Sequence, residues 1–452
     1  MHSEVKKYHF VGIGGIGMCG LAEYLLHNGQ IVTGSDLAPS ENTERLENLG
    51  AQIKYGHRRE NVDDCDYLVY SSAVKPDNPE RMVAIERQIP TLRRAELLGQ
   101  IFDTKPIRIA VSGTHGKTTT TAMIGQVLTT AELDPLILSG GVLKSSGSPV
   151  QIGKGDIVIA EADEFDRSFL QLSPTHAIIT NIESEHLDCY ANLTQIKNAF
   201  YEFTAKIPDA GRVIACSDEK EIPEFLKHHP RPYVTYGLYS GEFQARNIQL
   251  KGNSSECEVY HNSDLIGSLQ LHVPGLHNIK NGLAAIAMAS LLNIPFPVIQ
   301  EGLADFRGVK RRFEILQEND NLMLVDDYAH HPSEIAATLN AARKGWQRRI
   351  IAVFQPHLFS RTRDFYPEFA LVLRVADVIV LLEIYPAREA PLEGISSRLI
   401  YDEIRKDRTQ DVYLTNTLDE ALALLQEIKL TGDMIITLGA GDVNKILLKL
   451  ME

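Results

Sequence analysis

A short loop rich in glycine and threonine carries the clearest chemical signature in the chain. Its residues are Gly113, Thr114, His115, Gly116, Lys117, Thr118 and Thr119, and they follow a β-branched run at 107–111. Backbone N–H groups around the glycines can wrap phosphate oxygens, Lys117 can neutralise β- and γ-phosphates, and Thr118 can offer a hydroxyl to Mg²⁺. Val111 stands where the usual phosphate loop has its first glycine, so the spacing is only partly specific. A threonine-rich helix cap is the alternative, and it leaves Lys117 unexplained.

Carboxylates follow the next two apolar runs. Glu161, Asp163 and Glu164 come after the run 156–160, and Glu183 and His186 come after the run 176–180. Hard cations prefer oxygen ligands, and Mg²⁺ takes one or two carboxylates together with phosphate oxygens. An imidazole beside them could ligate a second metal or orient a nucleophile. A solvated acidic surface is the competing interpretation.

A second glycine loop lies near the N-terminus, between the run 8–13 and a helical segment. Its residues are Gly12, Gly14, Gly15, Ile16 and Gly17. Asp36 directly follows the next run, 31–35, and Ser71 and Ser72 directly follow the run 67–70. Glycines there allow a diphosphate to approach a helix N-terminus, and an acid at the position of Asp36 is suited to a ribose. The same geometry serves NAD or any other nucleotide diphosphate, so both alternatives stay open at this stage.

The last third of the chain carries acids, imidazoles and guanidinium groups, and two of its clusters directly follow apolar runs. These residues are Arg312, Asp326, Asp327, Tyr328, His330, His357 and Arg361. Together they could bind a carboxylate and a phosphate. Asn281 precedes an alanine-rich helix expected at 283–292, where its amide could contact an adenine edge or simply cap the helix.

The elements that must position these residues alternate throughout the chain. Apolar, β-branched runs are expected as strands at 8–13, 31–35, 67–70, 107–111, 156–160, 176–180, 322–325, 349–354, 378–384 and 433–438, with helical segments between them. This alternation predicts βαβ units and parallel sheets, in which ligands bind beyond the carboxyl ends of the strands. Alternating polar and apolar residues at 234–273 indicate antiparallel hairpins added to the middle of the chain.

Length and composition limit the classes of protein. A chain of 452 residues exceeds a single core, so two or three domains are expected, with boundaries near 104–106 and 308–312. The net charge is 45 − 59 = −14, which disfavours nucleic acid as a partner. No apolar run reaches the roughly 18 residues of a membrane span, and the N-terminus does not read as a secretory signal. The expected location is the cytoplasm.

Taken together, the motifs resemble the Mur ligase family from end to end. The marks are HFVGIGGIGM, GTHGKTTTT, EADEFDRSFL, NIESEHLD, HNIKN, RRFE, DDYAHHPSE and FQPHLFSRTRD. The resemblance implies an α/β protein of three domains. These would be a Rossmann-like domain for a UDP-sugar (1–104), a central P-loop ATPase with a parallel sheet and a small antiparallel part (105–310), and a Rossmann-like domain for an amino acid (311–452).

The resemblance also implies the reaction and its participants. It is nearest to the branch that joins L-alanine to UDP-N-acetylmuramate with ATP and Mg²⁺ (Mn²⁺ as a substitute), for peptidoglycan synthesis. Lys117 would bind phosphate, Thr118 and Glu161 would bind metal, and His186 would ligate a second ion. ATP would be bound by Asn281 and Arg312, and its ribose by Asp326 or Asp327. The incoming alanine would lie near Tyr328, His330 and His357. Arg361 would lie near the muramyl carboxylate or its phosphorylated form. A monomer or homodimer is expected.

One residue departs from the family pattern, and two rival functions stay open. Leu358 stands where the family commonly has arginine, so an anchoring charge is lost or comes from Arg361 or Arg363. A ligase of the same family that recycles the murein tripeptide is the nearest alternative. An NAD-dependent oxidoreductase, suggested by the first glycine loop alone, is the alternative from another class.

Overall fold

The computed structural model describes residues 4–183, 189–190, 192–227, 229–387, 389–406 and 411–451. The chain divides into two compact units. The first comprises residues 1–246, 258–269 and 280–307, and the second comprises residues 247–257, 270–279 and 308–452.

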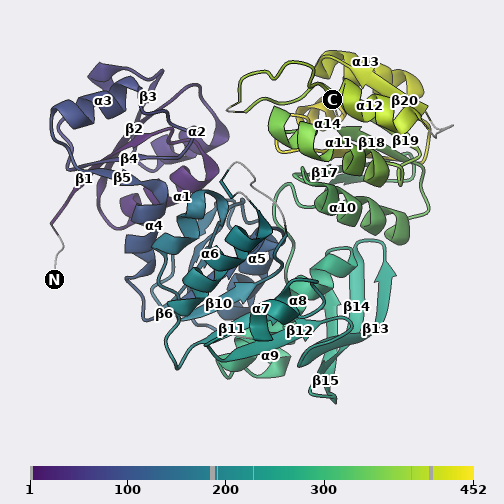
Figure 1. Cartoon of the computed structure of the whole chain (residues 1–452), viewed down its shortest axis with the longest axis horizontal. Helices are drawn as coiled ribbons and strands as arrows, with labels where there is room; N and C mark the ends of the chain where they lie inside the picture. The colour runs from purple at the N-terminus through teal and green to yellow at the C-terminus, as the bar shows by residue number, and fades with distance from the viewer. Residues whose placement is uncertain are drawn as a thin grey trace. The chain divides into compact units, whose positions relative to one another are not determined.

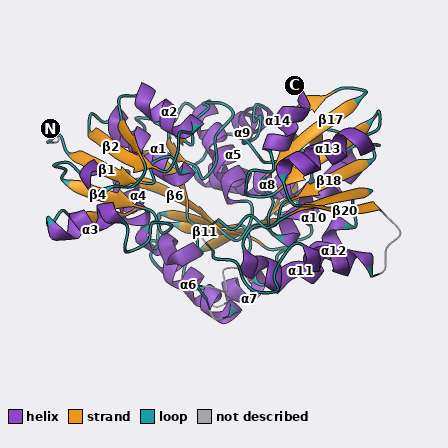
Figure 2. Ribbon diagram, turned by 90° about the horizontal axis from the view of Figure 1, so that it is seen from above, coloured by secondary structure: helices purple, strands orange, loops and turns teal. Residues whose placement is uncertain are grey.

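A five-stranded parallel sheet opens the first unit. Its strands lie in the order β3 (Gln52–Tyr55), β2 (Ile31–Asp36), β1 (Lys7–Val11), β4 (Tyr67–Tyr70) and β5 (Thr91–Arg93). Its helices are α1 (Ile16–His27), α2 (Glu41–Asn48), α3 (Pro79–Glu86) and α4 (Arg94–Phe102), with the short η1 (Arg59–Asn61). One apolar cluster joins α1, α2 and α4 to one face of the sheet, and another joins α3 to the opposite face. Figure 2 shows α2 and α3 on opposite sides of these strands.

The central sheet carries the phosphate loop. Its order is β15 (Asp264–Leu271), β14 (Ser254–His261), β13 (Phe243–Lys251), β12 (Tyr233–Gly237), β11 (Arg212–Cys216), β10 (His176–Ile179), β6 (Ile107–Ser112), β9 (Ile157–Glu161), β7 (Leu136–Leu138) and β8 (Val150–Gln151). The associated helices are α5 (Lys117–Thr130), η2 (Phe165–Gln171), α6 (Leu193–Ala205), α7 (Ile222–Lys227), α8 (Leu276–Leu291) and α9 (Phe296–Ala304).

Parallel pairing prevails in the middle of this sheet. The pairs β6–β9, β6–β10 and β10–β11 are all parallel, so their carboxyl ends meet at one edge. The hairpins expected across 234–273 begin later than predicted, because β12 pairs with β13 in parallel. β13, β14 and β15 then follow one another as neighbours through two short turns (Figure 1).

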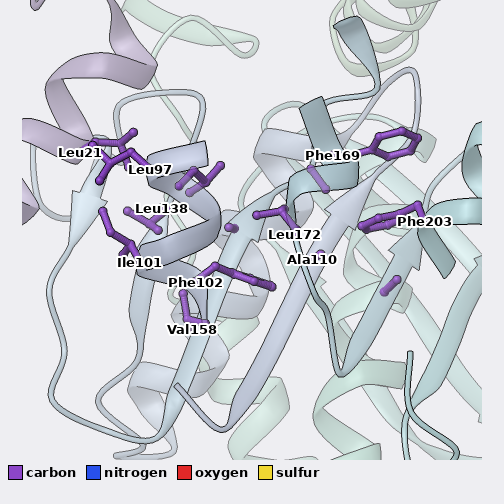
Figure 3. Close-up of a cluster of buried hydrophobic side chains, with 14 of the residues drawn as sticks. Leu21, Leu97, Ile101, Phe102, Ala110, Leu138, Val158, Phe169, Leu172 and Phe203 are labelled. Carbon is purple, nitrogen blue, oxygen red and sulfur yellow. The ribbon is translucent and has the colours of Figure 1, made fainter. Parts of the chain in front are cut away.

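A continuous apolar core joins the N-terminal sheet to the central sheet within the first unit. Figure 3 shows Leu21 of α1 and Leu97 and Ile101 of α4 grouped with Leu138 of β7, and all belong to one buried cluster. α4 approaches η2 so closely that a Cβ on Gly99 would lie 2.5 Å from the Gln171 carbonyl oxygen. Glycine inside α4 therefore permits this close packing.

The second unit contains a six-stranded sheet with helices on both faces. The order is β16 (Glu314–Glu318), β17 (Leu322–Asp327), β21 (Asp433–Leu438), β18 (Ile350–Phe354), β19 (Val378–Leu382) and β20 (Asp411–Thr415), and only β16 is antiparallel to its neighbour. The helices are α10 (Pro332–Gly345), α11 (Phe359–Leu373), α12 (Arg398–Arg405), α13 (Leu418–Ile428) and α14 (Lys445–Met451). Figure 2 shows α10–α12 on one side of these strands and α13 and α14 on the other, each side with its own core.

The predicted α/β fold with parallel sheets and a small antiparallel part is confirmed. All ten expected strands are present, two of them with the predicted bounds: β4 and β21. Within the described ranges, no helix is both long and apolar enough to cross a membrane.

Candidate functional site

The phosphate loop connects β6 to α5 and is fastened by the end of β10. Gly113 has a φ of +130°, and a Cβ there would lie 2.1 Å from Thr180 Oγ1. Thr180 Oγ1 donates to the carbonyl oxygen of His115 over 2.5 Å, and His115 N donates to Asn181 Oδ1 over 2.9 Å. α5 has no acidic residue in its first turn. The N-terminus of α5 therefore presents backbone N–H groups, held in place by the loop, and the positive end of the helix dipole to an anion.

Lys117 points back into this loop. Its Nζ donates to the Gly113 carbonyl oxygen over 2.7 Å and to Glu164 Oε2 over 3.0 Å, and Asp163 Oδ1 lies 3.8 Å away. The sequence alone indicates Glu164 only as one member of an acidic run after β9. Its contact with Lys117 shows that the run supplies the counter-charge of the loop lysine.

Glu161 ends β9 next to the phosphate loop, as expected for a metal carboxylate. Thr118 Oγ1 lies 3.1 Å from Glu161 Oε2, and the other carboxylate oxygen accepts hydrogen bonds from Ser139 Oγ and Gly140 N. A hydroxyl and a carboxylate side by side are the hard oxygen donors that Mg²⁺ takes together with phosphate oxygens, so these residues fit the ion. His186 lies outside the described residues, so its place as a ligand stays a prediction.

The side chain of Asn281 borders the phosphate loop. The helix expected to begin at Leu283 begins at Leu276, so Asn281 lies inside α8, and the capping alternative is wrong. The reason is that buried apolar residues such as Ile279 continue the packed face of α8 toward its N-terminus. Thr120 Oγ1 donates to Asn281 Oδ1 over 3.2 Å, which fixes the amide beside α5.

The N-terminal glycine loop is held by the end of β2. The N–H groups of Gly12 and Ile13 donate to the Ser35 carbonyl oxygen over 2.9 and 3.0 Å. Gly14 N donates to Asp36 Oδ2 over 2.7 Å, and the other oxygen of Asp36 accepts from Leu37 N. Asp36 therefore shapes the loop, and its contact with a ribose stays a prediction. Gly15 is the residue before α1, and Ile16 and Gly17 form its first turn.

Three arginines near this loop were not found from the sequence. The atom nearest to a Cβ built on Gly17 is Arg94 Cδ, at 3.1 Å. The guanidinium of Arg81 lies 4.0 Å from the centre of the Tyr70 ring, and Arg93 pairs with Tyr70 in the register of β4 and β5. Ser71 and Ser72 follow β4 at the same sheet edge. In a chain of net charge −14, these cations form a local positive region of the kind that would attract a diphosphate.

The imidazoles of the second unit meet as predicted. The ring centres of His330 and His357 are 5.7 Å apart, and Tyr328 packs edge-on against His330 at 5.3 Å. Arg361 NH1 lies 3.3 Å from His357 Nδ1. Tyr385, which the motifs did not indicate, stacks on His357 with ring centres 6.0 Å apart. These five side chains form one polar and aromatic group at the carboxyl ends of β17, β18 and β19.

Two arginines near Leu358 could replace the charge that is missing from the family pattern, and their positions differ. Leu358 is buried with a φ of +72°, immediately before α11. Arg361 is also largely buried and faces His357, whereas the guanidinium of Arg363 is exposed and bonds Asp364. Only Arg361 therefore joins the imidazole group.

Asp326 and Asp327 end β17 and are both buried. Asp327 accepts hydrogen bonds from Phe313 N, Ala329 N and Thr338 Oγ1 at 2.8–3.0 Å, and burial raises its pKa to about 6 against the opposing charge of Arg312. Burial likewise raises the pKa of Asp326, although Arg311 lies 2.9 Å away. Both carboxylates hold the turn before β16.

Arg312 faces two groups of the second unit. Its NH1 lies 3.6 Å from Glu334 Oε1, and its guanidinium lies 5.2 Å from the centre of the Tyr328 ring. Arg312 therefore borders the imidazole group, and its predicted contact with ATP stays a prediction, as do the ribose contacts of Asp326 and Asp327.

Comparison with known proteins adds an independent line of evidence. Three family models match in succession: the Mur ligase family, catalytic domain at 7–106, the Mur ligase middle domain at 111–289, and the Mur ligase, glutamate ligase domain at 311–441. The chain is 46% identical to the UDP-N-acetylmuramate--L-alanine ligase of Geobacter sulfurreducens, covering 98% of this chain and 96% of that relative. The corresponding ligase of Syntrophotalea carbinolica is 44% identical over 99% and 97% of the two chains.

Solved structures agree with the sequence relatives. The UDP-N-acetylmuramate-alanine ligase MurC from Thermotoga maritima has a TM-score of 0.86 and 31% identity, covering 99% of this chain and 98% of that one. The UDP-N-acetylmuramate:L-alanyl-gamma-D-glutamyl-meso-diaminopimelate ligase from Neisseria meningitides has a TM-score of 0.63 and 26% identity, covering 68% and 100%.

Proposed function

The chain belongs to the Mur ligase family, and from that membership we propose that it joins L-alanine to the lactyl carboxylate of UDP-N-acetylmuramate, using ATP and forming an acyl phosphate. The observation that carries the proposal is the phosphate loop of α5, with Lys117, Thr118 and Glu161 in contact around it. Relatives that share nearly the full length of the chain bear the name of this activity. The product is a precursor of peptidoglycan.

Activation of the carboxylate falls to the first unit. A carboxylate at neutral pH does not accept an amine, so the γ-phosphoryl group of ATP must first be transferred to it. Such a transfer needs positioning and charge neutralisation. The N–H groups at the start of α5 and the ammonium group of Lys117 supply both. Thr118 and Glu161 would hold Mg²⁺, which neutralises charge on the phosphate oxygens when bound.

The second unit is proposed to hold the amino acid. The Arg361 guanidinium can only donate, so its contact places the neutral His357 proton on Nε2. His330 Nδ1 lies 2.9 Å from the Tyr328 carbonyl oxygen, to which it donates, so the lone pair of neutral His330 is on Nε2. We therefore assign His330 as the base that accepts the proton of the alanine ammonium group, and Arg361 as the partner of the muramyl carboxylate. The amine then attacks the acyl phosphate and phosphate leaves.

The test is phosphate release from ATP with UDP-N-acetylmuramate, with and without L-alanine. Turnover that requires both compounds, with equimolar amide product, is the expected result. The murein tripeptide offered in place of L-alanine separates the recycling ligase from the proposed one. Turnover with the tripeptide but not with L-alanine would reassign the amino-acid site, and no phosphate release with either would reject the ligase reaction.

A further inference from the structure

One segment of the first unit touches both nucleotide regions. Residues 139–149 run between β7 and β8, and we call them the connecting segment. It is closed by its own hydrogen bonds, from Ser139 N to the Pro149 carbonyl oxygen (2.9 Å) and from Leu143 N to the Ser148 carbonyl oxygen (3.0 Å). Because these bonds join its two ends, a displacement at one end reaches the other.

One end of the connecting segment is fixed to α1. Ser148 Oγ donates to Glu23 Oε2 over 2.8 Å, and Ser148 itself is only 5% exposed. Glu23 is also buried, and Arg45 Nε of α2 donates to the same carboxylate oxygen over 3.2 Å. Pro149 packs against α1 where a Cβ on Gly20 would be, 3.5 Å away. A buried, charge-assisted hydrogen bond therefore ties the segment to the helix that begins at the N-terminal glycine loop.

The other end of the connecting segment holds Glu161. Gly140 N donates to Glu161 Oε1, and Ser139 Oγ lies 3.4 Å from the same oxygen. A Cβ on Gly140 would lie 2.6 Å from Glu161 Oε2, so the absence of a side chain at Gly140 permits this close approach to the carboxylate. Glu161 in turn contacts Thr118 of α5.

We propose that Ser148 is a positioning residue that couples the sugar-nucleotide site to the metal site, by holding the connecting segment between Glu23 and Glu161. This rests on the proposed function, which places the sugar nucleotide at the glycine loop and the metal at Glu161. A sugar nucleotide that fixes α1 fixes Glu23, Ser148 and Gly140, and so holds Glu161 in the geometry that binds metal and nucleotide. By linkage, each ligand then raises the affinity for the other by the same factor.

The experiment measures the dissociation constant of Mn²⁺ and ADP by electron paramagnetic resonance, with and without UDP-N-acetylmuramate. In the unaltered protein, the sugar nucleotide should lower this dissociation constant at least about fivefold, the lower end of typical couplings. The coupling ratio is the dissociation constant without the sugar nucleotide divided by the constant with it. Ser148→Ala should reduce that ratio to near one, while the affinity for the sugar nucleotide alone changes less than about twofold. Ser148→Thr retains the hydroxyl and should restore the ratio.

Three further variants separate the coupling from a general loss of structure. Ser145→Ala makes the same change at an exposed position of the connecting segment and should leave the ratio intact. Glu23→Ala removes the other partner, and the Glu23→Ala/Ser148→Ala double variant should lose no more coupling than either single variant.

The outcomes distinguish this proposal from the proposed function. A ratio near one in the unaltered protein, or an unchanged ratio in Ser148→Ala, would overturn the coupling while alanine-dependent turnover stands. Absence of any binding of UDP-N-acetylmuramate to the unaltered protein would overturn the proposed function first. A Ser145→Ala variant that loses as much coupling as Ser148→Ala would also reject the role of Ser148.

Discussion

Replacing Glu80 with glutamine should strongly destabilise the N-terminal sheet. The Glu80 carboxylate is fully buried at the start of α3 and accepts hydrogen bonds on both oxygens: His9 Nε2 (2.9 Å) and Ser35 Oγ (2.7 Å) on one, Asn61 Nδ2 (2.8 Å) and Arg58 N (3.1 Å) on the other. Glutamine has one acceptor oxygen, so its amide group would face two donors. Two hydrogen bonds to a charged acceptor are lost, which costs about 3–5 kcal/mol of the free energy of unfolding.

The pH dependence of this effect has a definite sign. Burial raises the pKa of Glu80, but hydrogen bonds from His9, Asn61 and Ser35 outweigh it and hold the pKa below the usual 4.5. A depressed pKa means that the ionised carboxylate stabilises the fold above pH 4.5 and that this contribution is lost as the pH falls through the lower, folded value. The full cost of Glu80→Gln should therefore appear at pH 7 and shrink in acid.

Urea unfolding followed by circular dichroism, with amide exchange in β1 and β2, measures the effect. Glu86→Gln is the matched control on the same helix, because Glu86 pairs with Arg59 at the surface, where ion pairs contribute little. Glu80→Gln should also weaken binding of the sugar nucleotide. Ser35 donates its hydroxyl to Glu80, and its carbonyl oxygen holds the N–H groups of Gly12 and Ile13. A loss of stability in Glu80→Gln no larger than in Glu86→Gln would refute the reasoning.

Three other predictions test the site. Lys117→Ala should lower alanine-dependent phosphate release by about 10²-fold or more and leave calorimetric binding of UDP-N-acetylmuramate intact; retained turnover would remove Lys117 from the phosphate site. Arg361→Ala should lower kcat/KM for the sugar nucleotide by about 30–100-fold, whereas Arg363→Ala, whose guanidinium pairs with Asp364 at the surface, should change it less than about threefold; equal losses would contradict the assignment. The carboxyl carbon of Asp327 should titrate in NMR near pH 6, because burial raises the pKa of this group. The contribution of Asp327 to the free energy of unfolding should therefore fall as the pH rises from 3.8 toward 6. A titration midpoint below about 4 would show that the carboxylate is not desolvated.

Local patterns were sufficient for the strands that carry the motifs. β1, β6, β9 and β18 are short, largely apolar runs with distinctive residues at their ends. Gly12 and Gly113 directly follow β1 and β6, Glu161 is the last residue of β9, and His357 lies three positions after β18, so the sequence predicts both the strand and the residues at its end. β7 is only three residues long, and its assignment depends on the neighbouring β9. Short strands of this kind have too few residues for a pattern, and their pairing is decided by burial.

The site residues that the sequence missed all depend on long-range contacts. Ser148 meets Glu23 across 125 positions, and Tyr385 stacks on His357 from the end of a different strand. Neither residue lies in a motif that distinguishes it from other serines or tyrosines. Their roles follow from which helices and strands pack together.

The sequence by itself determined which chemical groups follow each strand and which family the chain resembles, because turn residues, helix starts and strand patterns are local properties of the chain. Only the tertiary structure decided where those groups point. It placed Asn281 inside a helix against Thr120, turned Arg361 toward His357 and Arg363 toward solvent, and set Gly140 against Glu161. Side-chain direction depends on packing partners that lie far away in sequence, and those partners are defined only when the core has formed.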